Sequence, residues 1–281
     1  MKICLINPPC SDGYLSNMYS MQHIGIAYIA SCLEKHGYET DIIECQIQNM
    51  NISAVMKQLE EKKYDLIGFS VYFYNKSFAL KLAIKIKRKL DCFLYIGGYY
   101  PTLYREETFR TFYFIDCIVV GEGEMTTIDL AKKLDKGDNW RCIEGISYVE
   151  DGKIIDTAPR KLIENLDALP YPKRIVGKNN YMVPIISSRG CYGRCTFCGV
   201  KEFYDNCIGK KKRNRSVTDF VSELEELVQL YDPQVIYVSD ETFFEASNVR
   251  QQWLNELFDL LACKNYNLEY RCQARANDAI Y

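Results

Sequence analysis

The sequence contains one short segment in which three cysteines lie close together. Cys191, Cys195 and Cys198 have the spacing C-x3-C-x2-C directly after an apolar run. Glycines precede and interrupt the group, so a short loop can turn back and gather three thiolates. Thiolates are the ligands of iron–sulfur clusters, and three of them leave one iron of a cubic cluster open. The pattern predicts a 4Fe–4S cluster with a free coordination position.

Other interpretations of the same cysteines stay open. A tetrahedral structural zinc site needs a fourth ligand, which Cys207 could supply, whereas no histidine follows His36 in the sequence. A redox pair of the C-x-x-C type would leave Cys191 unused. A chance cluster in a chain with 13 cysteines is the remaining alternative.

The composition limits the classes of partner. The formal net charge of −2 gives no global attraction to nucleic acid or to an anionic membrane, so we expect neither as a partner. No apolar run reaches the roughly 18 residues of a membrane span. The cysteines outside the cluster are scattered along apolar segments, where reduced thiols behave as small hydrophobic groups. We therefore expect a reducing, cytoplasmic location.

The first half of the chain alternates between apolar runs and segments with helical spacing. The runs predict strands, and the spacing in His23–Lys35 is typical of one apolar helix face. Such alternation predicts a Rossmann-like, flavodoxin-like parallel sheet covered by helices on both faces. The predicted strands are Lys2–Asn7, Thr40–Glu44, Leu66–Val71, Phe93–Gly97 and Ile115–Val120.

Loops at the carboxyl ends of parallel strands commonly hold ligands. The loops after the first, fourth and fifth predicted strands contain proline or glycines that allow a close approach of the backbone. They could equally be tight strand–helix turns, and no G-x-G-x-x-G dinucleotide motif is present. The candidate ligand-binding residues in these loops are Pro8, Gly97, Gly98, Thr102, Gly121, Glu122 and Gly123.

The pattern divides the chain into three parts. Residues 1–140 form the first α/β domain, and residues 141–180 form a linker with a hairpin around Glu150-Asp151-Gly152. Residues 181–281 hold a second strand–helix series of about three units, at roughly 30 residues per unit. Ser216 is expected to cap the first long helix of this series.

The cysteine motif resembles the signature of radical S-adenosylmethionine (radical SAM) enzymes, which is specific in this context. The resemblance implies that S-adenosylmethionine chelates the open iron and is cleaved to a 5′-deoxyadenosyl radical. It implies that Phe197 lies against the adenine. It also implies that Asp240, at the end of a predicted strand, binds the methionyl end of the cofactor, although a capped helix start is the simpler alternative.

Most of residues 1–175 resemble the cobalamin-binding domain that is often fused to this family. The resemblance rests on five segments, and it adds Ser70 to the candidate corrin-binding residues. The D-x-H-x-x-G loop that supplies a cobalt-ligating histidine elsewhere is absent, which leaves a domain without a histidine ligand or one that has lost cobalamin. The segments are 5–9, 25–37, 65–70, 97–102 and 121–124.

Together these resemblances imply a cobalamin-dependent radical SAM enzyme that transfers a methyl group to an unactivated carbon of a small molecule or peptide. They imply an electron donor such as flavodoxin or ferredoxin. They name no catalytic residue. The alternatives are a non-methylating radical SAM enzyme with a structural cobalamin-like domain, or a non-catalytic corrinoid- and cluster-binding subunit of a split enzyme.

The second domain departs from the family. Its three predicted units are about half of the family's partial (β/α) barrel, so a truncated barrel is expected. The chain would then be a fragment of a longer enzyme, or be completed by another polypeptide or a second copy of itself, or be a degenerate protein that binds a cluster without turnover. The last strand would then expose an unpaired edge, which favours association. We expect the isolated chain to be poorly soluble or oligomeric.

Overall fold

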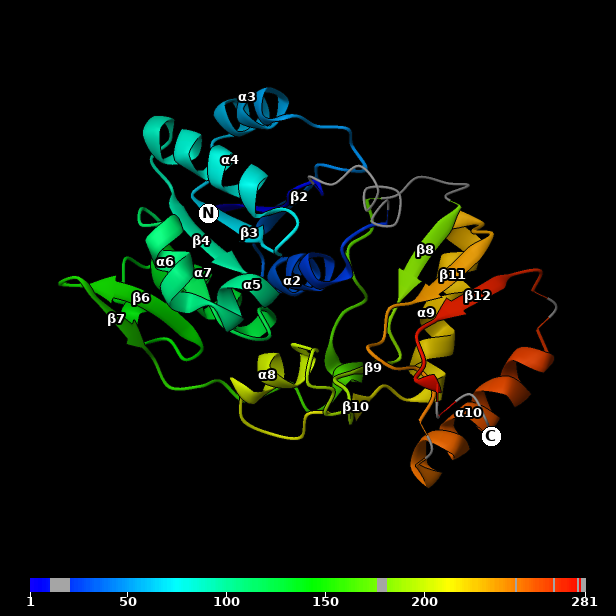
Figure 1. Cartoon of the computed structure of the whole chain (residues 1–281). Coiled ribbons are helices and arrows are strands. Elements are labelled where there is room, and N and C mark those ends of the chain that lie inside the picture. Colours follow the sequence, from blue (N-terminus) through cyan, green and yellow to red (C-terminus); the bar gives the residue numbers. More distant parts are fainter. Residues whose placement is uncertain (11–20, 176–180, 246, 265, 277, 279–281) are drawn as a thin grey trace. The chain divides into compact units, whose positions relative to one another are not determined.

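The computed structural model describes residues 1–10, 21–175, 181–245, 247–264, 266–276 and 278 (Figure 1). The chain forms two compact units. Unit 1 comprises Met1–Leu162, Pro172–Arg174 and Glu202–Gly209. Unit 2 comprises Ile163–Tyr171, Ile175–Lys201 and Lys210–Tyr281.

Unit 1 is built on a seven-stranded sheet with the order β2-β1-β3-β4-β5-β6-β7. The first five strands are parallel, which confirms the predicted Rossmann-like class. They are buried almost throughout, as apolar strands covered on both faces must be. The strands are β1 (Lys2–Asn7), β2 (Glu39–Glu44), β3 (Leu66–Ser70), β4 (Phe93–Gly97), β5 (Cys117–Val119), β6 (Ile146–Glu150) and β7 (Lys153–Asp156).

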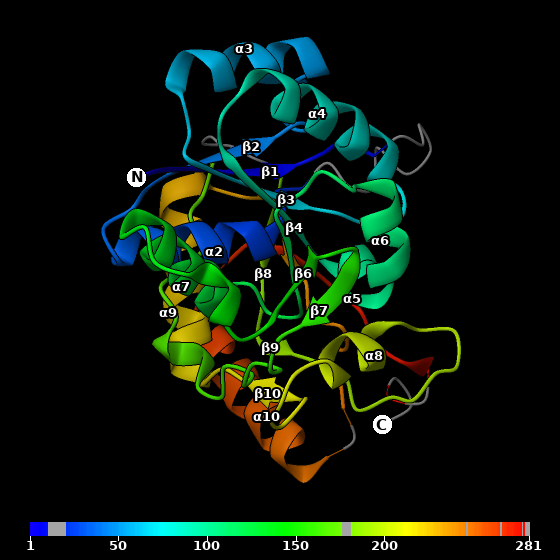
Figure 2. The same cartoon turned by 90° about the vertical axis from the view of Figure 1, so that its left-hand side faces the viewer.

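Helices cover both faces of this sheet. Figure 2 shows α3 (Ile52–Lys62) and α4 (Lys76–Lys89) on one face, and α2 (Ile24–Lys35) and α7 (Glu124–Asp135) on the other. The helices begin where side chains satisfy the free N–H groups of the first turn. Asn51, for example, accepts a hydrogen bond from the Ala54 N–H at 3.0 Å. This layering brings the ends of β1, β3, β4 and β5 to one edge.

The predicted hairpin forms, and it extends the first sheet. β6 pairs antiparallel with β5 and with β7, so the sheet continues into the segment that we assigned to a linker. Its turn uses Asp151 and Gly152, both of which have positive φ.

A short helix occupies the stretch after β4 that we predicted to be a loop. α5 (Tyr99–Leu103) begins two residues after the end of β4, and α6 (Arg105–Thr111) follows it. Gly98 has φ +100°, and a Cβ there would lie 3.0 Å from the Val71 carbonyl oxygen, so only glycine lets the chain turn this closely into α5. Pro101 is tolerated because it lies in the first turn, where its missing N–H leaves no helical bond unmade.

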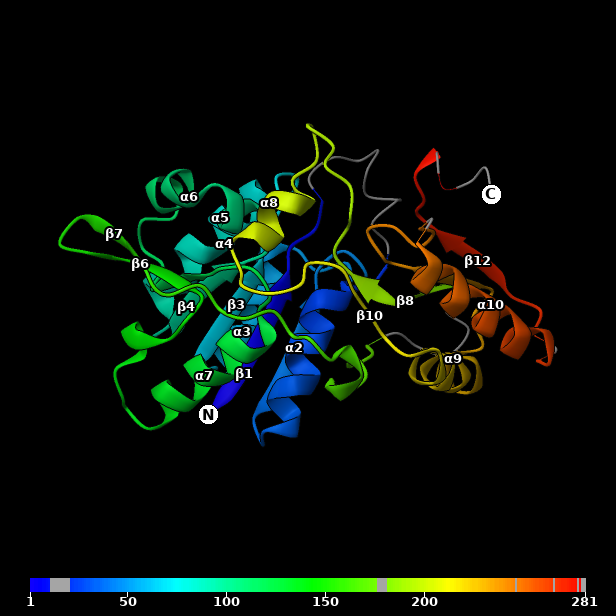
Figure 3. The ribbon, with the colours of Figure 1, turned by 90° about the horizontal axis from the view of Figure 1, so that it is seen from below.

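Unit 2 contains a three-stranded parallel sheet with the order β12-β11-β8. Its strands are β8 (Met182–Ile185), β11 (Val235–Val238) and β12 (Glu269–Cys272). The core packs Val183, Ile185, Ile236 and Val238 against α9 (Val217–Tyr231) and α10 (Asn248–Ala262), both drawn beside the strands in Figure 3. Ser216 caps α9 by accepting from the Asp219 N–H at 3.1 Å, as predicted.

Two short strands lie beside this sheet. β9 (Ser188–Arg189) pairs antiparallel with β10 (Arg213–Asn214). α8 (Val200–Asp205) and the 3₁₀ turns η1 (Trp140–Cys142) and η2 (Leu166–Ala168) complete the elements of the described residues. In the part of the chain that the structure describes, no helix has the length and apolar character needed to cross a membrane.

Candidate functional site

The cysteine loop begins at a glycine that cannot be replaced without a clash. Gly190 follows β9 and has φ +83°. A Cβ at this position would lie 2.1 Å from the carbonyl oxygen of Lys211. Lys211 lies just before β10, the strand that pairs with β9. The Gly190 N–H donates to a Glu241 carboxylate oxygen at 3.0 Å. Glu241, three residues after the end of β11, therefore fixes the start of the loop.

The three thiols of the loop are free. Cys191 and Cys198 are half-buried, Cys195 is exposed, and none is in a disulfide. The Gly193 N–H lies 3.3 Å from the Cys191 sulfur, and the Cys198 N–H donates to the Cys195 carbonyl at 3.1 Å. Among the described residues, no three Cys, His, Asp or Glu side chains are gathered closely enough to hold a metal ion. The donor set fits an iron–sulfur cluster, and the loop must close further to bind one.

Two further predicted residues have different surroundings. Phe197 is 91% exposed, so its ring is available to a ligand and is not part of the core. Cys207, weighed above as a fourth zinc ligand, is buried in unit 1, where its sulfur fills the space beside Gly121. Sequence spacing alone did not indicate this packing.

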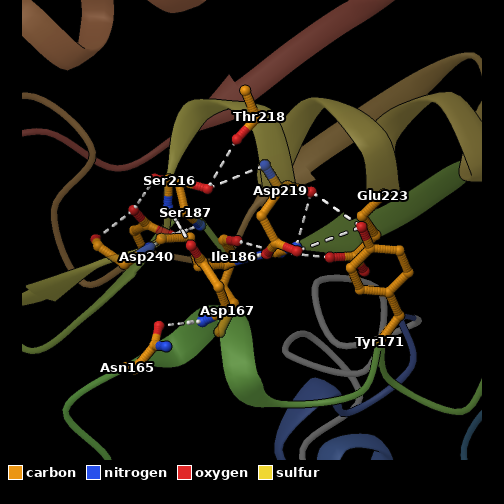
Figure 4. Close-up of polar contacts among 12 residues, drawn as sticks. Asn165, Asp167, Tyr171, Ile186, Ser187, Ser216, Thr218, Asp219, Glu223 and Asp240 are labelled. Atoms are coloured by element: carbon orange, nitrogen blue, oxygen red, sulfur yellow. Dashed lines mark hydrogen bonds and ion pairs between the residues drawn. The ribbon is translucent and has the colours of Figure 1, made fainter.

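Asp240 is buried at the end of β11 and supports the strand end that leads to the cysteines. Its Oδ1 accepts from the Ser187 and Ser188 N–H groups at 2.7 and 3.1 Å. Its Oδ2 accepts from the hydroxyl groups of the same two serines, each at 2.5 Å. Figure 4 shows Asp240 directed at Ser187. The carboxylate therefore positions the chain before β9, and its predicted contact with S-adenosylmethionine stays a prediction.

Two cations, the buried Arg250 and the half-buried Lys212, balance the Asp240 charge. Arg250 lies 3.5 Å from the carboxylate, donates to the Ser187 hydroxyl at 2.7 Å and is completely buried between Phe243 and Trp253. Lys212 donates to the Ser188 hydroxyl at 2.7 Å. Desolvation lowers the pKa of Lys212, and nearby Asp240 opposes that shift. Removing the charge of Asp240 would leave the charge of Arg250 buried without a partner, which is unfavourable.

The basic run 210–215 also serves the fold. Arg215 is buried, pairs with Asp219 at 2.6 Å and with Glu223, and donates to the Ile186 carbonyl at 2.9 Å. Arg213 donates to the Ile163 carbonyl at 2.8 Å. These contacts give Arg213 and Arg215 a structural role within unit 2.

In unit 1 the predicted loops meet at the carboxyl edge of the sheet. The Gly121 N–H donates to the buried Thr102 hydroxyl at 3.1 Å, which joins the loops after β4 and β5. Ser70, at the end of β3, is buried. The loop residues Gly98, Glu122 and Gly123 are partly exposed, whereas Pro8, Gly97 and Gly121 are buried.

Sequence reasoning missed Asn75, which ties two of these loops together. Asn75 is completely buried; its Nδ2 donates to the carbonyls of Ser70 and Pro8 at 3.2 and 3.4 Å, and its Oδ1 accepts from the Tyr72 N–H at 2.7 Å. An asparagine in the short loop between an apolar strand and a helix was the available signal.

His23 was also missed as a member of this edge. Its Nδ1 accepts from the Ile26 N–H at 3.2 Å and so caps α2. The proton therefore resides on Nε2, which lies 2.9 Å from the Tyr72 hydroxyl and 3.1 Å from the Ser70 hydroxyl. Burial lowers the pKa of His23 to about 4. The ring is neutral near pH 7, and both nitrogens are engaged within the protein.

A row of aromatic rings lies along the same edge. Tyr72 stacks with Tyr74 at 5.2 Å between ring centroids and with Tyr99 at 5.8 Å, and Tyr99 stacks with Phe203 at 4.3 Å. We define these four rings as the aromatic row. Tyr72, Tyr74 and Tyr99 are partly exposed, and Phe203 is buried.

Comparison with known proteins identifies the first unit. Residues 17–131 match the model of the B12 binding domain. The chain is 31% identical over 254 residues to an uncharacterized methyltransferase of Pyrococcus horikoshii, which covers 86% of this chain and 54% of the relative. It is 27% identical over 258 residues to the anaerobic magnesium-protoporphyrin IX monomethyl ester cyclase of Rubrivivax gelatinosus, which covers 86% of this chain and 45% of the relative.

A solved structure has the same fold. The cobalamin-dependent S-adenosylmethionine radical enzyme OxsB, with aqua-cobalamin and S-adenosylmethionine bound, superimposes with a TM-score of 0.83 at 23% identity. The match covers all of this chain and 39% of that enzyme. The chain thus spans about half the length of the curated relatives that it matches, and less of this structure.

Proposed function

This chain carries a B12 binding domain and is related to cobalamin-dependent radical SAM enzymes, and from this premise we propose that it binds cobalamin and a 4Fe–4S cluster and takes part in radical cleavage of S-adenosylmethionine. We propose methyl transfer to an unactivated carbon as the reaction. The observation that carries the proposal is the loop of three free thiols, Cys191, Cys195 and Cys198, in a chain that also contains the cobalamin unit.

The chemistry divides between the cofactors and the protein. When bound, the cluster supplies the electron that cleaves the sulfonium, and the corrinoid supplies the methyl group. The three thiols would hold the cluster, and Phe197 would lie against the adenine. Asp240, Glu241 and Arg250 would keep the thiol loop in place through Ser187, Ser188 and Gly190.

In unit 1 the strand-end loops would hold the corrinoid. Pro8, Ser70, Gly98 and Gly121 are the proposed contacts, and Thr102 and Asn75 would fix their geometry. His23 does not offer an unused ring nitrogen to a metal, so the corrinoid would bind without an imidazole ligand from this residue. The electron donor would be a small protein such as a flavodoxin or ferredoxin.

A second candidate is a radical SAM enzyme that does not transfer methyl groups. The observation in its favour is that one of the relatives named above is a cyclase, not a methyltransferase. Under this proposal the cobalamin unit would have a structural or electron-transfer role.

The experiment is anaerobic reconstitution of the full chain with iron, sulfide and hydroxocobalamin, followed by analysis of products after reduction. The proposal expects about four irons per chain, bound corrin, and 5′-deoxyadenosine from S-adenosylmethionine. Transfer of label from S-[methyl-¹⁴C]adenosylmethionine to corrin separates the two candidates. Iron-loaded chain that forms no 5′-deoxyadenosine would refute both.

A further inference from the structure

The segment Glu202–Gly209 follows the cysteine loop in sequence, yet it belongs to unit 1. It lies more than 70 residues beyond residues 17–131, which match the B12 binding domain. α8 contributes Phe203 and Tyr204, both buried. The corrin-binding unit of this chain is therefore completed by residues that directly succeed the thiol loop. We call Glu202–Gly209 the docking segment.

The docking segment contributes one ring, Phe203, to the aromatic row. The Phe203 ring stacks on Tyr99 at 4.3 Å with an interplanar angle of 21°. Tyr99 opens α5 directly after Gly98, and it stacks in turn on Tyr72. Phe203 thus packs on the loop after β4 and, through Tyr99, on the loop after β3. Both loops contain residues that we propose as corrinoid contacts.

Two polar or small side chains of the segment reach the neighbouring loops. Arg105 donates to the Asn206 side-chain oxygen at 2.6 Å and to the Thr102 carbonyl at 2.5 Å. The Cys207 sulfur lies 2.2 Å from the position that a Cβ of Gly121 would take. Gly121 is therefore needed for the segment to dock.

The backbone of the segment is also fixed in unit 1. The Ile208 N–H donates to the Arg160 carbonyl at 2.9 Å, and the Leu162 N–H donates to the Ile208 carbonyl at 2.8 Å. These bonds form an isolated parallel bridge between Lys161 and Ile208. Ring stacking, side-chain contacts and backbone bonds together tie the segment to the strand-end loops.

Docking restricts the thiol loop. β9 and β10 close the base of the excursion that runs from Gly190 to Lys212. When the docking segment is held in unit 1, residues 190–201 are the part of the excursion before it that remains free. A shorter free stretch has less conformational entropy to lose when its three thiols converge. A ligand that orders the strand-end loops would therefore lower the cost of assembling the cluster.

We propose that corrinoid binding in unit 1 and cluster assembly on Cys191, Cys195 and Cys198 promote each other, and that the docking segment carries the coupling. The inference rests on the proposed function, because it needs both cofactors to bind. Thermodynamic linkage makes the effect reciprocal: the factor by which corrinoid strengthens iron loading equals the factor by which the cluster strengthens corrinoid binding.

The test measures both directions on the full chain under anaerobic conditions. Iron and sulfide uptake at limiting iron is measured with and without saturating hydroxocobalamin. The Kd for hydroxocobalamin is measured by equilibrium dialysis with and without the cluster. We expect a coupling of roughly 5- to 50-fold in the wild-type chain, equal in the two directions.

Variants locate the coupling. Phe203→Ala removes the stacked ring, and we expect the coupling factor to fall toward one. Phe203→Tyr keeps a ring and should restore the coupling. Asn206→Ala tests the segment at a half-buried position that is less important for folding. Phe258→Ala, at an exposed phenylalanine on α10, is the matched control and should leave the coupling unchanged.

The outcomes separate the two proposals. Wild-type chain that binds both cofactors with affinities independent of each other overturns the coupling and leaves the proposed function intact. Coupling that survives in both Phe203→Ala and Asn206→Ala overturns the role of the docking segment. Wild-type chain that binds neither cofactor overturns the proposed function and the coupling with it.

Discussion

At the scale of single residues, Asp240 shows how a buried carboxylate can fix the strand end that precedes the thiol loop. Its two oxygens accept four hydrogen bonds from Ser187 and Ser188, which lie just before the thiol loop. The buried charge is offset by Arg250. Such a group fixes the backbone because any movement of the strand end would leave a buried carboxylate unsatisfied.

We expect Asp240→Asn to disorder the start of the thiol loop. The amide has one acceptor oxygen in place of two, and breaking the buried pair with Arg250 costs about 3 to 5 kcal/mol. Iron content after reconstitution should fall several-fold, and amide hydrogen exchange at Ser187–Arg189 should accelerate. Asp259→Asn, at an exposed position on α10, is the control. Unchanged iron content together with unchanged exchange would contradict the positioning role.

The thiols themselves give the second prediction. Changing Cys191, Cys195 and Cys198 together to Ala should abolish bound iron and sulfide, because no other described residues form a metal-binding group. Corrin binding in unit 1 should persist. Cys263→Ala, at an exposed cysteine on the end of α10, should leave iron content unchanged. Iron retained by the triple variant would argue against this ligand set.

The thiol loop could be predicted from sequence because its signal is local: three cysteines and their glycines lie within a few residues. Asn75 and His23 could not be predicted, because their roles depend on residues brought together only by the fold. His23 meets Ser70 across 47 positions, and Asn75 meets Pro8 across 67. A sequence shows the type of such residues and not their partners.

At the scale of elements, features with a local sequence signal were predicted, and features that are too short or depend on distant residues were missed. The five parallel strands and the cap at Ser216 follow from apolar runs and local hydrogen bonding, and they are found as expected. α5 and α6 were missed because each is short and their pattern is too brief to show a helical period. The membership of residues 202–209 in unit 1 depends on long-range packing that no local pattern records.

The turn before the thiol loop gives a third prediction. Gly190→Ala should reduce iron loading, because the new Cβ would meet the Lys211 carbonyl at 2.1 Å in addition to the strain of positive φ. Gly37→Ala is matched, with φ +86° and no atom within 4 Å, and should cost about 1 kcal/mol through backbone strain alone. Urea unfolding and iron content are the measurements. Equal effects of the two substitutions on stability would contradict this view of Gly190.

The first turn of α2 and the end of β2 give a fourth prediction, on pH. Burial lowers the pKa of His23 from 6.5 to about 4. As pH falls from 6.5 toward 4, the histidine therefore takes up a proton in the unfolded chain but not in the folded one, and unit 1 loses stability. Burial raises the pKa of Glu44 from 4.5 to about 7, so the folded carboxyl keeps a proton that the unfolded one loses. This second effect stabilises unit 1 as pH falls from 7 to 4.5.

The two effects oppose each other, and variants should separate them. Between pH 7.5 and 5, His23→Asn should gain stability relative to wild type by roughly 1 to 2 kcal/mol, and Glu44→Gln should lose a similar amount. Asparagine at position 23 retains a side chain that can cap α2. Urea unfolding at the two pH values measures both. If both variants had the wild-type pH dependence, neither group would titrate as described.

At the scale of the whole molecule, each unit has its own hydrophobic core and its own tryptophan. Trp140 packs on Phe93 and Tyr148 in unit 1. Trp253 packs in the core of unit 2 and donates to the Arg215 carbonyl at 2.8 Å. The two indoles therefore allow each unit to be followed separately.

We expect hydroxocobalamin to stabilise unit 1 first. In the Trp253→Phe variant, Trp140 fluorescence should show a urea midpoint that rises with ligand concentration. The free energy of unfolding should increase by about 1.4 kcal/mol for each tenfold increase in ligand above Kd. In the Trp140→Phe variant without iron, the Trp253 midpoint should move less. Identical shifts of the two reporters would show that the units unfold together.

The burial of Cys207 under Gly121 has a practical consequence for chemical labelling. Cys142, Cys195, Cys263 and Cys272 are exposed and should react at once with an alkylating reagent, whereas Cys207 is enclosed. Its reaction must wait until residues 202–209 detach, and the rate of its modification then reports how often they do. Mass spectrometry of Cys207 modification would therefore measure the rate of that opening without an introduced probe.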